Sequence, residues 1–82
     1  MTNFSNINDN SQSYTLGALT LIDEVSSTEY YIGISSGSKD GSIASWNIKK
    51  IWQDGTVWKT EFPNGDQSFT FIWNNRAGYT YQ

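Results

Sequence analysis

Carboxylates are the side chains best suited to acid–base chemistry in this 82-residue chain, because the sequence has no histidine and no cysteine. Without those residues neither a Ser-His-Asp nor a Cys-His arrangement can form, and a zinc site would need carboxylate ligands alone. A pair of carboxylates can hydrolyse glycosides, and the candidates are Asp23, Glu24, Glu29, Asp40, Asp54, Glu61 and Asp66. Turn formation accounts for Asp40, Asp54 and Asp66, and we expect Asp23 and Glu24 to be solvated loop charges. We therefore predict a protein that is not an enzyme.

Two oxygen-rich segments, Asn8-Asp9-Asn10 and Asp40-Gly41-Ser42, contain the ligand types that calcium prefers. Neither has the spacing of an EF-hand loop. The glycines between Gly33 and Gly41 do not form a G-x-G-x-x-G motif before a helix, and a P-loop lysine is missing. We expect no metal and no cofactor.

The overall charge argues against two classes of partner. Five basic and eight acidic residues give a net charge of −3 and a pI near 4.5, which repels a phosphate backbone. The sequence begins without a basic and apolar leader, and no apolar run approaches the roughly 18 residues that span a bilayer. We expect no nucleic acid, no membrane and synthesis in the cytoplasm.

Thirteen aromatic residues are the other chemical resource, since tryptophan and tyrosine stack on sugar rings and anchor protein interfaces. Trp52 and Trp58 flank a predicted hairpin tip and are candidates for contact with a partner or a host glycan; the alternative is that they complete a small core. We expect Arg76 to stack on an aromatic ring or to pair with a carboxylate. Other aromatics are expected in the core: Trp46, Phe62, Phe69 and Trp73.

The chain divides into an N-terminal arm, residues 1–13, and one domain, residues 14–82. The arm contains only Phe4 and Ile7 as large apolar groups, too few to offset the cost of ordering it. It is either a disordered tail or an arm that orders on a neighbouring subunit, with Phe4 and Ile7 as anchors.

Residues rich in strand formers predict β-strands over 14–22 and 29–35, with a turn or loop over 23–28. A cluster of serine, glycine and aspartate over 36–42 predicts an exposed, flexible loop. The next segments, 44–52 and 56–62, predict a hairpin whose three-residue loop ends at Gly55. That register opposes Lys50 with Trp58 and places Lys59 and Glu61 on the face away from Trp46.

Pro63-Asn64-Gly65-Asp66 predicts a further turn. The spacing of Phe69, Ile72, Trp73 and Arg76 then favours a short helix or single turn, capped by Asp66 or Ser68 and ended by Gly78. A final strand over 78–82 would place Tyr79 and Tyr81 on one face and leave an edge for pairing with another copy. The predicted fold is mainly β: a small antiparallel sheet or barrel-like domain of about five strands, with one short helical turn near the C-terminus.

Several segments in the second half form an ordered pattern. They are Tyr31-Ile32-Gly33, Ala44-Ser-Trp-Asn-Ile-Lys-Lys-Ile51, Phe62-Pro-Asn-Gly65, Phe69-Thr-Phe-Ile-Trp-Asn-Asn-Arg76 and Tyr79-Thr-Tyr81. Over about residues 30–82 the chain resembles a family of small structural proteins and C-terminal modules of tailed bacteriophage virions. Phe62-Pro63 stands where that family has a tryptophan or tyrosine followed by alanine, and Tyr79 where an aliphatic residue is common.

The resemblance implies a virion structural protein and transfers no catalytic residue. We expect a head decoration or cement protein that forms homo-oligomers and attaches to other virion proteins of the capsid or tail. The alternative is a tail or fibre component that binds a carbohydrate or receptor. The expected interface residues are Phe4, Ile7, Trp52, Trp58, Tyr79 and Tyr81.

Overall fold

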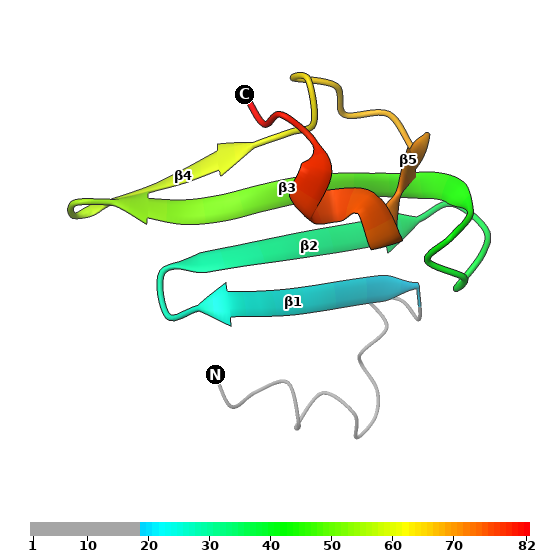
Figure 1. The fold of residues 1–82 in the computed structure, drawn as a ribbon, viewed down its shortest axis with the longest axis horizontal. Helices are drawn as coiled ribbons and strands as arrows, with labels where there is room; N and C mark the ends of the chain where they lie inside the picture. Colours follow the sequence, from blue (N-terminus) through cyan, green and yellow to red (C-terminus); the bar gives the residue numbers. More distant parts are fainter. Residues whose placement is uncertain (1–18) are drawn as a thin grey trace.

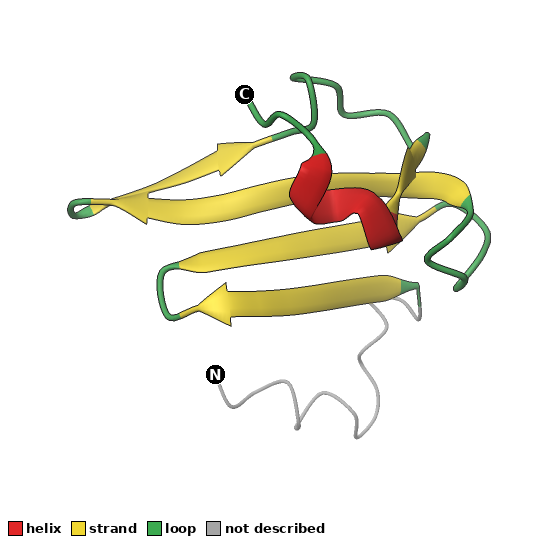
Figure 2. Cartoon of the chain, in the orientation of Figure 1, coloured by secondary structure: helices red, strands yellow, loops and turns green. Residues whose placement is uncertain are grey.

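The computed structural model describes residues 19–82, and these form one open antiparallel sheet with a short helix lying across it (Figures 1 and 2). The predicted arm, with Phe4 and Ile7, lies outside the described residues, as does the first part of the strand predicted over 14–22. The elements in chain order are β1 (Thr20–Ser26), β2 (Glu29–Ser35), β3 (Ala44–Asp54), β4 (Val57–Glu61), β5 (Phe71–Ile72) and the 3₁₀ helix η2 (Trp73–Gly78). The prediction of a mainly β fold with a short helical turn near the C-terminus is confirmed.

The first four strands follow one another as a meander in the order β1-β2-β3-β4. Strand β3 is the longest, with 11 residues. On the edge opposite β2 it pairs with two strands: β4 with its last residues and β5 with its first. Because each strand is joined to its neighbour by a short connection, the sheet needs no crossover, and β1 and β4 form its outer strands.

The covered face of the sheet carries the core, because alternate side chains of each strand point to it. Tyr31 and Trp46 lie on this face with Ile48, and they pack with Phe71 and Trp73, all at most 9% exposed. The Trp46 and Trp73 rings lie 5.8 Å apart at a tilt. A single aromatic cluster therefore holds the sheet to the C-terminal segment.

Helix η2 crosses the covered face above β2 and β3, as Figure 1 shows. The predicted helical turn exists and ends at Gly78 as predicted, but its start and its N-cap were wrong. It begins at Trp73 after an uncapped Ile72, whereas the Asp66 carboxylate accepts from the Ser68 amide in the preceding loop. Pairing of Phe71 with β3 makes that segment a strand, and Phe69, predicted in the core, is 44% exposed.

The chain end was predicted as a strand over 78–82 with a free edge, and this was wrong. Gly78 belongs to η2, and the last residues pair with the segment after β4: Phe62 and Gln82 exchange two backbone hydrogen bonds of 3.0 Å, and Pro63 bridges Tyr81. The turn predicted at Pro63 is confirmed, and Asn64 (φ 54°) and Gly65 (φ 74°) both adopt the positive φ of a type I′ turn.

The hairpin between β3 and β4 forms, but in a different register. Lys50 faces Glu61 and Gln53 faces Trp58, which leaves a two-residue turn in place of the predicted three-residue loop. Gly55 has φ 67° and stands first in that turn, the glycine position of a type II′ turn, whose twist matches the strands. The shift of register moves Lys59 and Glu61 onto the face of Trp46, and Trp58 onto the opposite face.

Strand β1 continues to Ser26, through a region predicted as loop. Asp23 faces Tyr31 across the β1–β2 ladder and accepts from Arg76 Nε at 2.9 Å. Asp23 was predicted as a solvated loop charge, and this was wrong. It is a strand residue of the covered face that pairs with Arg76, a cation from a distant part of the chain.

Candidate functional site

The side of the sheet opposite helix η2, which we call the open face, carries an apolar surface hollow. This hollow is lined by Ile22, Tyr30, Ile32, Ile51 and Trp58. Ile22 and Trp58 are each 48% exposed, and the Tyr30 and Trp58 rings lie 6.1 Å apart. No described segment covers these side chains. An exposed, contiguous apolar patch is typical of a contact surface.

The open face follows directly from strand alternation. In β2, Tyr30, Ile32 and Ile34 point to it, while Tyr31 and Gly33 point to the core. Because both sets are apolar, the strand is hydrophobic on two sides although only one is covered. The two-sided apolar pattern of β2 is visible in the sequence, but a prediction based on the tryptophans does not use it.

The two tryptophans predicted as contact residues lie on opposite faces. Trp58 belongs to the open face and is exposed. Trp52 belongs to the covered face, where its indole Nε1 donates to Glu61 at 3.1 Å and the Lys59 ammonium lies 5.4 Å from its ring. The two rings cannot form a single platform for one sugar ligand, because they are separated by the sheet.

Tyr79 and Tyr81 pack against the core cluster. The Tyr79 hydroxyl accepts from the Ile72 amide at 2.9 Å, and the Tyr81 hydroxyl donates to the Arg76 carbonyl at 2.8 Å. Burial, together with the nearby Tyr31 and Tyr79, raises the pKa of Tyr81 above its usual range. Both tyrosines therefore brace the C-terminal segment from within.

Arg76 performs both of the roles that the sequence suggested. Its guanidinium carbon lies 4.5 Å from the Trp73 ring, and its Nε donates to Asp23. Its Nη1 donates to the Trp73 carbonyl at 3.1 Å. These contacts join helix η2 to the outer strand β1.

The loop over 36–42 was predicted as exposed, and most of its residues are. Several hydrogen bonds nevertheless shape it. The Ser35 hydroxyl accepts from the amides of Gly37 and Ser38, and Trp46 Nε1 donates to the Asp40 carbonyl at 3.2 Å. Hydrogen bonds from the Ser42 backbone and side chain lower the pKa of Asp40. These contacts tie the loop to the core.

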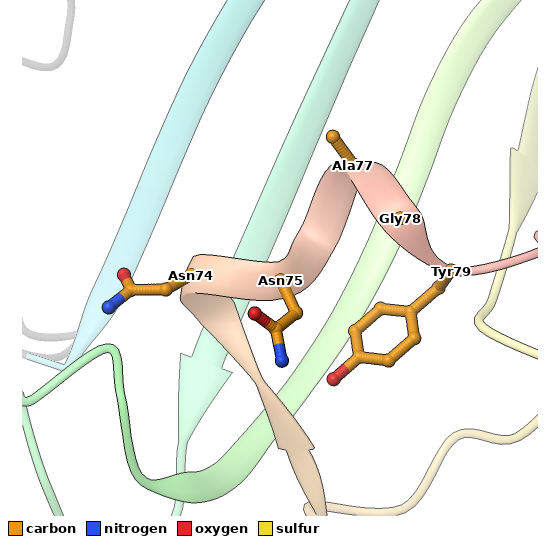
Figure 3. A pocket seen from close by; sticks show the side chains of 5 residues that line it. All are labelled: Asn74, Asn75, Ala77, Gly78 and Tyr79. Atoms are coloured by element: carbon orange, nitrogen blue, oxygen red, sulfur yellow. The ribbon is translucent and has the colours of Figure 1, made fainter.

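A second, more polar hollow lies along helix η2 (Figure 3). Asn75 and Tyr79 point to the same side of the helix, whereas Ala77 points away from it. The Asn74 side chain lies over Gly41, where a methyl group on the glycine would meet the amide oxygen at 2.6 Å. The asparagine amides and the Tyr79 hydroxyl, which already accepts from the Ile72 amide, can form hydrogen bonds. They supply neither a general base nor a nucleophile.

The carboxylates considered for catalysis are dispersed and mostly occupied. Asp54 pairs with Lys59 at 2.9 Å, and Glu29 lies 3.7 Å from Lys50. Residues 19–82 contain no group of three acidic, histidine or cysteine residues placed to hold a metal ion. In the same part of the chain, no helix has the length and apolarity to cross a membrane.

Comparison of the chain with protein-family models, with curated proteins and with solved structures found no match.

Proposed function

We propose that the chain is a structural protein of a tailed bacteriophage particle, a decoration or cement protein of the head that works by contact and not by catalysis. The open face supports this proposal most directly, because it offers apolar contact surface without catalytic groups. The ordered motifs between residues 30 and 82 supply the link to virion proteins.

The residues of those motifs are also the ones that build the fold. Gly33 allows the Trp73 ring to approach β2, the Trp46 and Trp73 rings contact each other at a tilt, and Arg76 joins η2 to β1. A motif of this kind preserves a scaffold, so that the function would lie in the surfaces that the scaffold presents.

The test is the protein's location. Mass spectrometry of gradient-purified particles of the encoding phage should detect the chain in many copies per particle, and it should remain with the heads when heads and tails are separated. Recovery with isolated tails would favour the tail or fibre alternative. Absence from particles that contain all other virion proteins would contradict the proposal.

A direct binding measurement sharpens the same test. Heads prepared without this chain should bind the added purified protein to saturation. Trp58→Ala should weaken that binding, because the open face supplies a contact either to the head or between the copies that bind it together. Thr56→Ala, an exposed change at the hairpin turn, is the matched control.

A further inference from the structure

We propose that the open face is covered by the open face of a second copy of this chain, so that two sheets pack into a two-fold symmetric β-sandwich. This inference deepens the proposed function, since it names the partner and the surface of the expected oligomer. It is tested independently of particle location.

The first argument is the unequal cover of the two faces. A sheet that is apolar on both sides is stable when both sides are covered. Helix η2 and the chain end cover one side, and on the other Ile22, Ile34 and Trp58 are each at least 40% exposed. A second sheet is the natural cover for such a surface, because side chains of two sheets interdigitate at a spacing of about 10 Å.

The second argument is charge. Two charged strand residues point to the open face: Lys49, which faces Ile32, and Glu24, which faces Tyr30. Neither has an ion-pair partner among the described residues. One cation and one anion make the face locally neutral and self-complementary, although the chain has a net charge of −3.

The third argument is register. A two-fold axis parallel to β2, between the stacked sheets, places β3 of one copy over β1 of the other. In each sheet Lys49 and Ile22 both face Ile32, so the three residues lie side by side on neighbouring strands. Lys49 of one copy therefore lies above Ile22 of the second copy. Glu24 of the second copy stands two residues, about 7 Å, further along the same strand. Both side chains are long enough to meet across the interface. The symmetry repeats the pair, so the dimer contains it twice.

The size of the contact sets the expected strength. The paired parts of β1, β2 and β3 project an area of roughly 300 Å², given about 4.8 Å between strands and about 3.4 Å per residue. The accessible area is larger but lies at or below the low end for stable complexes, where contacts are weak and transient. We therefore expect a weak dimer, with a dissociation constant on the order of micromolar or above, strengthened where copies are held side by side on a particle.

The experiment is sedimentation equilibrium of the full chain across roughly three decades of concentration around the micromolar range. The wild type should change from monomer to dimer. Lys49→Glu and Glu24→Lys should each raise the dissociation constant about tenfold or more, because each places like charges opposite one another twice. The double variant should return to near the wild-type value.

Lys39→Glu is the matched control. It makes the same charge change in the exposed loop between β2 and β3, and it should leave the dissociation constant unchanged. Circular dichroism of every variant establishes that the fold is retained, so that a lost dimer is not mistaken for a lost structure.

Carbodiimide coupling of a mixture of isotopically light and heavy copies provides the second readout. It should yield a mixed cross-link between Lys49 of one copy and Glu24 of the other. A wild type that stays monomeric, or a dimer indifferent to both charge reversals, would overturn the inference. A monomer that still occurs in particles would overturn the inference and leave the proposed function standing.

Discussion

The two faces of the sheet have similar composition but differ in burial. The covered face places Trp46 and Ile48 at 0% exposure under a helix, and the open face leaves Trp58 and Ile22 at 48%. Both contain tryptophan and isoleucine. The C-terminal segment crosses only one side of the sheet, so aromatic content alone does not distinguish core from contact surface.

Truncation of one tryptophan on each face should separate them most strongly. Trp46→Ala should cost about 3–5 kcal/mol, which rivals the total stability of a small domain, so this variant should be largely unfolded. Trp58→Ala should cost about 1 kcal/mol or less, because its ring already meets solvent. Urea unfolding followed by circular dichroism, at a concentration where the protein is monomeric, measures both. Equal losses would mean that the two faces are equally covered in solution.

A methyl group added to β2 should show how tightly the covered face is packed. A Cβ on Gly33 would lie 2.5 Å from the Trp73 ring, so Gly33→Ala should destabilise the fold by about 1–3 kcal/mol. Gly37→Ala is the control, since nothing lies within 4 Å of its added carbon. Thermal unfolding compares them, and an unchanged melting temperature in Gly33→Ala would show that η2 does not rest on the sheet in solution.

The contacts of Arg76 with Asp23 and Trp73, at the edge of the covered face, should give a smaller effect. Arg76→Ala removes the pair with Asp23 and the stacking on Trp73, both partly exposed, and should cost about 1–2 kcal/mol. Arg76→Lys should recover only part of the loss, because an ammonium cannot stack and donate in the same planar manner. Full recovery of stability with lysine would mean that Arg76 acts through its charge alone.

The last effect is among the smallest at neutral pH, changes in the alkaline range and concerns the tyrosines of the covered face. Burial raises the pKa of Tyr31 and of Tyr81, so the unfolded chain loses these protons at lower pH than the folded chain. The contribution of these two tyrosines to the free energy of unfolding is therefore constant below about pH 10, and it is lost as the pH rises above that value.

Tyr81→Phe checks this sign. It should cost about 1 kcal/mol at pH 7, through the lost hydrogen bond to the Arg76 carbonyl, and it should make the decline at alkaline pH less steep. The measurement is urea unfolding at a series of pH values between 7 and 11. An identical alkaline slope in wild type and variant would contradict the assignment.

Much of the architecture was predictable because it depends on local patterns. The strands over 29–35 and 44–52 and the turn at Asn64-Gly65 were predicted from propensity and turn chemistry, and the structure contains them. The hairpin register was missed because two different turns can both use Gly55. The open face was missed because it depends on which side of β2 the distant residues 73–81 cover.

By itself, the sequence determined that the chain is mainly β, that aromatic side chains supply its core, and that histidine and cysteine chemistry is absent. The burial of Trp46 and Trp73 was also predicted from the sequence, and the structure confirms it. Only the tertiary fold assigned Trp52 and Trp58 to opposite faces and left Phe69 exposed, because the hairpin register and the course of η2 and the chain end decide which rings are covered. Such a choice arises from contacts between residues far apart in the chain, which neither propensity nor spacing encodes.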